Sequence, residues 1–364
     1  CTVFEQRSHL GGMLYYGIPN YRLPKDRLME DISNILATGV EVRFNTSIGD
    51  DDGQLSFKML RENYDAVYVA IGAHTDKKLG IPGEDAKGVV SAVQMLREIG
   101  EGNPPDFTGK NVIVVGGGNV AMDATRSAIR LGANNVSVLY RRRKADMTAL
   151  EEEIEAAIAE GAEILELHAP KEIETNEEGH VTAMVADPKI IGLISGGRPM
   201  PAESNRQPIH LPCDVVIIAI GQDILSDSFA RAGLPVKRGR ILTSDDSSIP
   251  NVDGVFSGGD CVSGPATVIR AIAAGKVAAA NIDNYLGYNH IIESEVTVPD
   301  PRIENKSPCG RVTMMQRNTT ERKQDFELVE KGMSEKEAIQ EAHRCLRCDH
   351  FGYGVFKGGR VEEW

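Results

Sequence analysis

A glycine-rich turn is the segment of the sequence with the clearest chemical signature. Residues 116–121, Gly-Gly-Gly-Asn-Val-Ala, have the pattern G-x-G-x-x-A and lie between the apolar run 112–115 and a helical stretch. The first glycine permits a tight turn, the second lets a pyrophosphate approach, and the small third residue lets the helix pack closely on the strand. The first N–H groups of the helix attract phosphate. The turn predicts a dinucleotide site, with a plain β–α turn as the alternative, through Gly116, Gly118, Asn119, Val120 and Ala121.

Arginines follow the next strand expected in this unit. The run 136–139 is interpreted as a strand, and Tyr140-Arg141-Arg142-Arg143 comes directly after it. A site that prefers NAD usually has an acidic residue here for the ribose 2′-hydroxyl, whereas arginine can bind a 2′-phosphate. The first acidic residue after the strand is Asp146. Arg141 and Arg142 therefore predict NADP binding, with NAD use still open and a solvated basic loop as the alternative.

A second cluster of glycine and aspartate follows another short apolar run. Residues 254–267 read Gly-Val-Phe-Ser-Gly-Gly-Asp-Cys-Val-Ser-Gly-Pro-Ala-Thr, and a helix is expected to begin near Thr267. Gly259 and Asp260 would lie beside the start of that helix, where the carboxylate can accept hydrogen bonds from sugar hydroxyls. Taken alone, a Gly-Gly-Asp segment is more often just a turn.

These motifs require parallel strands that alternate with helices. The β-rich runs 64–73 and 213–222 both end in Ala-Ile-Gly, and together with 112–115 they indicate buried parallel strands. We therefore expect an α/β fold with two doubly wound Rossmann-like domains. Amphipathic or alanine-rich patterns predict helices at 25–38, 120–131, 147–160, 267–286 and 334–346. Ser334 and Glu337 form a capping-box pattern at the start of the last helix.

Length and charge limit the classes of protein that this chain can belong to. At about 150 residues per domain, 364 residues predict roughly two domains with an appendage. The net charge of −13 argues against unassisted binding to nucleic acid. No apolar run approaches the roughly 18 residues of a membrane span, and six scattered cysteines do not form a disulfide scaffold. We therefore expect a cytoplasmic protein without a nucleic-acid or membrane partner.

Several motifs together resemble one family. The segments 2–5, 11–24, 70–73, 116–123, 140–142, 219–221 and 258–260 are similar to the flavin-dependent pyridine-nucleotide oxidoreductases of the glutamate synthase small (beta) subunit type. The run Gly-Gly-Met-Leu…Gly-Ile-Pro…Arg-Leu-Pro within 11–24 is nearly diagnostic. The resemblance implies an FAD domain, at 1–107 and 225–290, that is interrupted by an NAD(P)H domain at 108–224 and followed by a C-terminal extension at 291–364 with an irregular tail and a short helix.

The resemblance also implies roles for single residues. It assigns Glu5 to the FAD ribose, Gly12 and Leu14 to the flavin-side loop, and Gly72 and Gly221 to strand ends beside the cofactors. Asp260 matches the residue near the ribityl chain, and Thr267 begins the helix that faces the flavin ring. Hydride passes between NAD(P)H and FAD in such enzymes, so the protein positions the two cofactors and provides their electrostatic environment. We therefore nominate no catalytic side chain and interpret the histidines as surface or structural residues.

One departure from the family concerns the N-terminus. The chain opens within a strand-like run at Cys1, and the family's FAD-pyrophosphate turn and amino-terminal iron–sulfur segment are not in the sequence. We interpret the chain as a piece of a longer flavoprotein. Two functions remain open at this point. One is an oxidoreductase subunit that passes electrons to the iron–sulfur centres of a ferredoxin-type partner subunit, and the other is a non-catalytic dinucleotide-binding scaffold of a larger redox complex.

The cysteines bear on two further alternatives. A disulfide reductase needs a paired thiol beside its cofactors, whereas Cys213 and Cys261 are single. The C-x-x-C pair Cys345 and Cys348 resembles part of an iron–sulfur motif, but a [4Fe–4S] cluster needs four ligands and only Cys309 is near in sequence. Either the pair is half of a cluster site that a partner completes, or it is structural.

Overall fold

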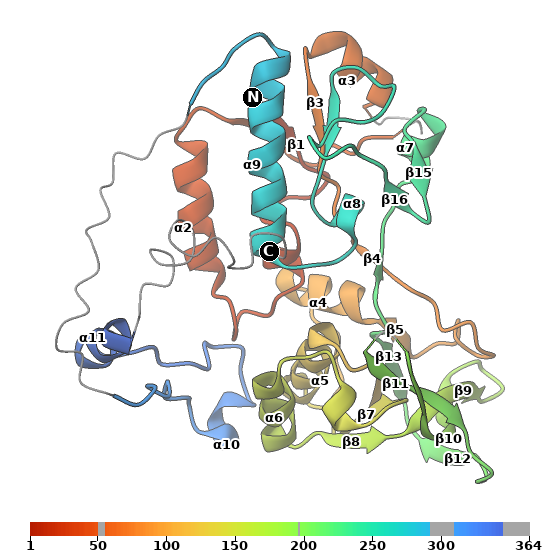
Figure 1. Cartoon of the computed structure of the whole chain (residues 1–364). Coiled ribbons are helices and arrows are strands. Elements are labelled where there is room, and N and C mark those ends of the chain that lie inside the picture. Colours follow the sequence, from red (N-terminus) through yellow and green to blue (C-terminus); the bar gives the residue numbers. More distant parts are fainter. Residues whose placement is uncertain (50–54, 196, 292–308, 345–364) are drawn as a thin grey trace. The chain divides into compact units, whose positions relative to one another are not determined.

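The chain forms two compact units in a computed structural model that describes residues 1–49, 55–195, 197–291 and 309–344. The first unit contains Cys1–Asn289 and the short segment Thr319–Glu327, and the second contains His290–Asn318 and Leu328–Trp364 (Figure 1). No helix in the described ranges is both long enough and apolar enough to span a bilayer.

A five-stranded parallel sheet forms the centre of one half of the first unit, the half that contains the glycine turn. Its order is β5 (Val89–Ser91), β13 (Val215–Ile218), β6 (Asn111–Val115), β7 (Asn135–Tyr140) and β8 (Glu163–Glu166). The residues of β13 are all buried, as expected for a strand covered on both faces. Because β5 pairs with β13, this sheet begins upstream of residue 108. A three-residue strand carries too little periodicity to be recognised in the sequence.

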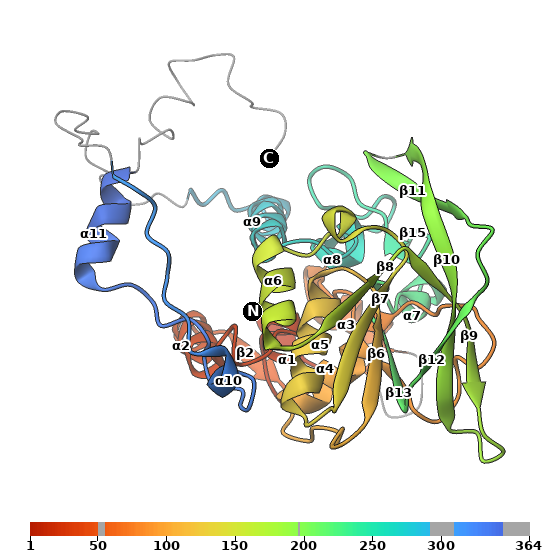
Figure 2. The ribbon, with the colours of Figure 1, turned by 90° about the horizontal axis from the view of Figure 1, so that it is seen from below.

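The two faces of this sheet are covered by different structures. One face packs against α4 (Ala92–Gly100), α5 (Asn119–Arg130) and α6 (Glu151–Glu160). The other packs against an antiparallel sheet, which we did not predict, through residues such as Ile173 and Met184 (Figure 2). Its strands are β9 (His168–Thr175), β10 (Val181–Ser195), β11 (Arg198–Glu203) and β12 (Ile209–Pro212). The expected α/β fold with a buried parallel sheet is confirmed, but an antiparallel sheet replaces the expected helices on one face.

The second half of this unit is built from two pairs of parallel strands. β1 (Thr2–Phe4) pairs with β2 (Glu41–Arg43), and β3 (Val67–Val69) pairs with β17 (Val255–Ser257). The strands β3 and β17 precede and follow the five-stranded sheet in sequence, so that sheet is inserted between two neighbouring strands. Phe4, Val69 and Val255 share one hydrophobic core with residues of α3 (Phe57–Asn63) and α7 (Asp227–Arg231).

Short strands and helices complete this unit. The antiparallel pair β4 (Thr75–Asp76) and β14 (Gln222–Asp223) connects the two halves, and β15 (Val236–Lys237) pairs with β16 (Arg240–Ile241). The remaining helices are α1 (Met13–Tyr16), α2 (Lys25–Leu36), α8 (Asp260–Ser263), α9 (Val268–Tyr285) and α10 (Thr319–Arg322). The boundaries of α2, α5 and α9 lie within two residues of those predicted.

The predicted helix 147–160 begins later than expected. A 3₁₀ turn, η1 (Lys144–Asp146), precedes it, and α6 starts at Glu151. The delay has a local cause, because the amides of Thr148 and Ala149 donate to the carbonyl of Gly117 at 3.0 and 3.1 Å. These bonds hold the segment on the glycine turn in a non-helical path.

The second unit contains one helix in the residues that the structure describes. α11 (Glu335–Arg344) begins at the predicted capping box, where Ser334 Oγ donates to Glu337 Oε2 at 2.7 Å. The predicted continuation of this helix to residue 346 lies outside the described residues. An antiparallel contact between residues 315–317 and 329–331 lies before the helix.

Candidate functional site

The glycine turn between β6 and α5 has a backbone that side chains would disrupt. Gly116 has a φ of +146°, and a Cβ atom there would lie 2.3 Å from the carbonyl oxygen of Ala219. A Cβ atom on Gly117 would lie 2.5 Å from the ring of Tyr140. At Gly118 the nearest atom, Thr148 Oγ1, would be at an ordinary 3.6 Å. The first two glycines therefore let β6, β7 and β13 come together at the turn, whereas Gly118 leaves space on its outer side.

Three backbone amides at this turn face no acceptor within the described residues. They belong to Gly118, Asn119 and Val120, the N-cap and first two residues of α5, and no side chain caps this helix end. Unpaired N–H groups at a helix N-terminus carry partial positive charge and bind phosphate oxygens. The fully buried Ala121 lets the helix pack on the sheet behind them. The turn thus fits the pyrophosphate of a dinucleotide.

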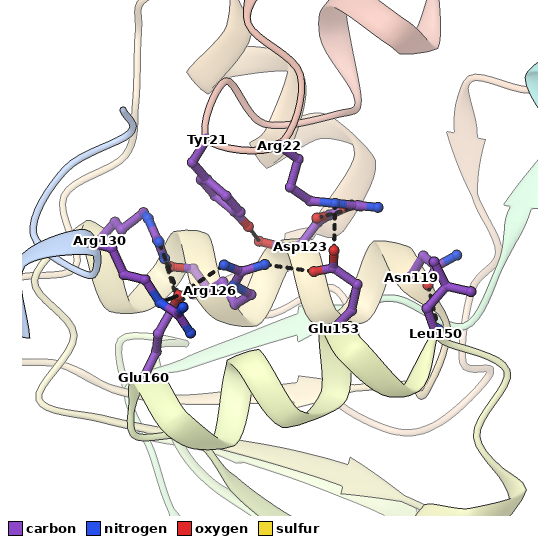
Figure 3. Close-up of polar contacts among 10 residues, drawn as sticks. Tyr21, Arg22, Asn119, Asp123, Arg126, Arg130, Leu150, Glu153 and Glu160 are labelled. Atoms are coloured by element: carbon purple, nitrogen blue, oxygen red, sulfur yellow. Dashed lines mark hydrogen bonds and ion pairs between the residues drawn. The ribbon is translucent and has the colours of Figure 1, made fainter. Parts of the chain in front are cut away.

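The side chain of Asn119 has a role that sequence spacing did not reveal. Its Oδ1 accepts a hydrogen bond from the amide of Leu150 at 2.9 Å (Figure 3). Together with the bonds from Thr148 and Ala149 to Gly117, this contact ties the β7–α6 segment to the glycine turn. The backbone amide of Asn119 stays available to the predicted phosphate site.

The three arginines after β7 lie in different environments. Arg141 is exposed, and none of the described residues forms a hydrogen bond or ion pair with its side chain. Arg142 is half-buried, and its Nε donates to the carbonyl of Pro199 at 2.9 Å. Arg143 forms two bonds of 2.8 Å with Asp146, and these hold the pKa of that carboxyl below its usual value. The first acidic residue after β7 is therefore already paired.

The residues assigned to the flavin side lie near strand and helix ends. Glu5 directly follows β1, and its Oε1 accepts from the amide of Arg7 at 2.8 Å. Gly12 has a φ of +50° and precedes α1, which contains Leu14. The carbonyl of Leu14 accepts from Lys25 Nζ at 2.9 Å. The loop is thereby held to the start of α2.

A second group of these residues precedes the long helix α9. Gly259 has a φ of +74°, and Asp260 Oδ1 accepts from the amide of Ala266 at 3.1 Å. Burial raises the pKa of Asp260, and the bond to Ala266 opposes that shift. Thr267 is the exposed N-cap residue of α9, but its side chain forms no capping bond. The helix end is therefore open to a polar group of a ligand.

The connections between the two halves contain the remaining predicted glycines. Gly72 and Gly221 have φ values of +66° and +135°, and the carbonyl of Gly221 accepts from the amide of Lys77 at 3.2 Å. A cavity of about 310 Å³ beside this connection is lined by residues that include His74, Asp76 and Arg97. Burial raises the pKa of Asp76 to about 6. Sequence reasoning did not identify this aspartate.

The described cysteines do not form a thiol pair. Cys213 is buried, which raises its pKa to about 12, and Cys261 is buried against the carbonyls of Val69 and Gly258. Cys309 is exposed, and its Sγ lies 3.7 Å from the carbonyl of Gln340. The predicted pair Cys345 and Cys348 lies outside the described residues. No cluster of metal-binding side chains was found within the described ranges.

A buried ionic network between α5 and α6 was also missed. Glu160 is fully buried and receives bonds from Arg126 and Arg130, which flank the ring of Tyr21 (Figure 3). Arg22 joins the network through Glu153, which pairs with both Arg22 and Arg126. The spacing of Arg126 and Arg130, one turn apart on α5, was a signal for a shared partner. The sequence did not show that the partner lies on α6, 30 residues further on.

Two known proteins are similar in sequence to almost the whole of this chain. The subunit beta of the NADP(+)-dependent formate dehydrogenase of Moorella thermoacetica is 39% identical over 373 residues, which cover 98% of this chain and 52% of the relative. The subunit beta of the NADPH-Fe(3+) oxidoreductase of Geobacter sulfurreducens is 33% identical over 390 residues, covering 96% and 57%. The chain thus spans little more than half the length of these relatives.

A shorter relative and a solved structure agree with this result. A putative glutamate synthase [NADPH] small chain of Cereibacter sphaeroides is 33% identical over 306 residues, covering 81% of this chain and 73% of the relative. The fold matches FprA of Mycobacterium tuberculosis in complex with NADPH, with a TM-score of 0.67 and 19% identity over 79% of this chain and 77% of that one. The model of the pyridine nucleotide-disulphide oxidoreductases matches residues 2–275. The chain therefore belongs to the pyridine nucleotide-disulphide oxidoreductase family, within its glutamate synthase small-chain-like group.

Proposed function

We propose that this chain is part of an NADPH-dependent flavin oxidoreductase subunit that transfers hydride between NADPH and FAD. The observation that carries the proposal is the set of unpaired amides at Gly118, Asn119 and Val120, placed at the carboxyl end of a buried parallel strand. This is the place where dinucleotide phosphates bind in such folds. The relatives named as NADPH-dependent enzymes support the same cofactor.

The strand pairing supports a domain organisation that we propose here. We infer a nucleotide-binding domain inserted in an FAD domain, and we extend its predicted start at residue 108 back to β5, to Val89. The FAD domain then consists of the segments on either side, with its second part at 225–290. The remaining residues, 291–364, form the C-terminal extension.

The side chains of this protein position the cofactors and provide an electrostatic environment, and none of them is proposed to transfer a proton. The cofactors carry the hydride chemistry when they are bound. The amides of α5 hold the pyrophosphate of NADPH, and Arg141 binds its 2′-phosphate. Glu5 and Asp260 hold the sugar and ribityl hydroxyls of FAD, while Gly12, Leu14 and the start of α9 border the flavin.

The partner is proposed from chemistry and from the names of the relatives. Two of the relatives are called subunit beta, so those proteins belong to multi-subunit redox enzymes. A flavin can accept a hydride and release single electrons, which suits an iron–sulfur partner subunit. We propose such a partner, and we keep the sequence-based proposal of a cytoplasmic location because of the scattered cysteines.

The spectrum of the flavin tests the function. We expect the complete polypeptide to purify yellow and to bleach when NADPH is added under anaerobic conditions. A colourless protein that NADPH leaves unchanged would favour the scaffold alternative. A lower content of iron and acid-labile sulfide in Cys345→Ser/Cys348→Ser than in the wild type would show that this pair belongs to a cluster, and equal contents would show that it does not.

Cofactor preference is tested at the arginines after β7. Arg141→Ala should lower kcat/KM for NADPH by about tenfold or more, with little effect on NADH, because a charge-assisted bond to phosphate contributes about 1.5–3 kcal/mol. Arg142→Ala should have a smaller effect, since Arg142 Nε already donates to Pro199. Arg143→Ala is the matched control, because its guanidinium is occupied by Asp146. An unchanged NADPH/NADH ratio in Arg141→Ala would show that this arginine does not bind the 2′-phosphate.

A further inference from the structure

The loop between α1 and α2 is attached to the nucleotide-binding helix by one arginine. Arg22 Nη1 donates to both carboxylate oxygens of Asp123, at 2.9 and 2.8 Å, and Arg22 Nε lies 2.9 Å from Glu153 Oε1 (Figure 3). Asp123 is on α5 and Glu153 is on α6. A single side chain of the proposed FAD domain therefore contacts two helices, α5 and α6, of the proposed nucleotide-binding domain.

The neighbouring tyrosine fixes the loop on the same helix. Tyr21 is 1% exposed, and its hydroxyl donates to the carbonyl of Asp123 at 3.3 Å. The guanidinium carbons of Arg130 and Arg126 lie 4.0 and 4.6 Å from the centre of its ring. These contacts are independent of Arg22, so the loop keeps an anchor when Arg22 is replaced.

The two partners of Arg22 are tied closely to the phosphate-binding turn. Asp123 lies in the second turn of α5, the helix whose first amides are unpaired. Glu153 follows Leu150 by three residues, and Leu150 is bonded to Asn119 of the glycine turn. A shift of the glycine turn would therefore also move Asp123 and Glu153, because α5 and the start of α6 connect these residues to the turn.

We propose that Arg22 is a positioning residue that aligns the flavin-side loop with the bound nucleotide. The proposal rests on the proposed hydride transfer between NADPH and FAD. Arg22 fixes where residues 11–14 lie relative to α5, and thereby the approach of the nicotinamide to the flavin. Hydride transfer depends steeply on that approach, since a misplacement of about 1 Å can cost roughly a hundredfold in rate.

A purely structural role for Arg22 makes different predictions. The Arg22 side chain is 22% exposed, and Glu153 keeps a second partner in Arg126 at 2.6 Å. Replacing Arg22 leaves Glu153 paired and the Glu160 network intact. It removes, however, the charged partner of the buried Asp123, which Asp123→Asn in the double variant neutralises. The phosphate-binding amides of α5 are also untouched. Loss of Arg22 should slow the hydride step without weakening nucleotide binding, whereas general loosening of the fold would affect both.

The decisive experiment separates binding from chemistry in the complete FAD-loaded protein. In Arg22→Gln we expect stopped-flow reduction of the flavin at saturating NADPH to be at least about tenfold slower, with the Kd for NADPH within about twofold of wild type. Arg27→Gln on α2 is the control, because Arg27 is exposed and pairs with Glu30 at the surface. Combining Arg22→Gln with Asp123→Asn should slow reduction no further, since both variants remove the same contact.

An independent measurement keeps the inference separate from the proposed function. In Arg22→Gln, amide hydrogen exchange should be faster in residues 11–24 and unchanged in β6 and β13. Wild-type flavin that NADPH does not reduce would reject the proposed function, and the exchange data would then still test the contact. Three results in Arg22→Gln would overturn the inference. The first is flavin reduction by NADPH at the wild-type rate, and the second is a weaker Kd for NADPH together with slower reduction. The third is unchanged amide exchange in residues 11–24.

Discussion

Replacing Glu160 tests how much the buried ion pairs between α5 and α6 stabilise the protein. The carboxylate of Glu160 is fully buried on α6 and receives Arg126 Nη2 at 2.9 Å and Arg130 Nη1 at 2.6 Å. Arg322 Nε, from the returning segment Thr319–Glu327, lies 2.9 Å from the same carboxylate. In Glu160→Gln these guanidinium groups would lose the negative charge that compensates their burial. Removing one partner of a buried ion pair costs about 3–5 kcal/mol.

That cost should be visible in thermal unfolding. For a domain of this size about 1 kcal/mol corresponds to roughly 2–4 °C, so Glu160→Gln should lower the unfolding midpoint by roughly 6–20 °C. Differential scanning calorimetry measures this shift directly. Glu155→Gln on the same helix is the matched control, because Glu155 forms a 2.8 Å pair with Lys144 at the surface, where ion pairs contribute little.

The pH dependence adds a second readout with a defined sign. Burial alone would raise the pKa of Glu160, but the bonds and charges of Arg130 and Arg126 outweigh it and hold the pKa below the usual 4.5. The unfolded state then binds more protons than the folded state as the pH falls below that value. The stabilisation is therefore present above pH 4.5 and lost as the pH falls through the folded pKa. Equal losses of stability in Glu160→Gln and Glu155→Gln would refute this reasoning.

Two further predictions concern the glycine turn and the buried thiol. Gly116→Ala should lower the unfolding midpoint of the ligand-free protein, because the new Cβ would meet the carbonyl of Ala219. Gly118→Ala should leave the unfolding midpoint unchanged and weaken NADPH binding, as measured by calorimetry. Equal midpoints for the two variants would contradict this assignment. Cys213 should resist iodoacetamide at pH 8 in the folded protein, because burial raises its pKa to about 12, while the exposed Cys1 reacts. Peptide mass spectrometry checks this, and early alkylation of Cys213 would show that the thiol is accessible.

The sequence was most informative where local physics determines structure. The glycine turn, the buried strands around it and helices such as 25–38 have strong patterns, because tight turns and buried faces restrict residue types. The two Ala-Ile-Gly strand ends also indicated two similar units. The short strand β5 was not recognised, and neither was the antiparallel sheet β9–β12. β5 has only three residues, and the residues of β9 are mixed in polarity and mostly half-buried or exposed, so neither strand has a clear alternation.

Contacts between distant segments could not be predicted in the same way. Arg22 and Asp123 are 101 positions apart, and no local pattern indicates that a loop arginine meets a carboxylate on a remote helix. Asn119 shows a subtler limit. Its place in the turn was predicted, but its side chain binds the Leu150 amide, which became visible only from the fold.

The arginines of the half that contains the glycine turn differ in burial, and burial determines whether each one stabilises the fold or is available to a ligand. Arg126 and Arg130 are buried and paired with carboxylates, so their charge is already compensated and adds little to the field at a ligand site. Arg143 is likewise occupied by Asp146. Arg141 is exposed and has no such partner among the described residues, so its guanidinium can donate to an incoming phosphate without breaking a bond within the protein. The sequence shows these arginines as similar basic residues, and the pairing of their charges identifies Arg141 as the one to test for NADPH recognition.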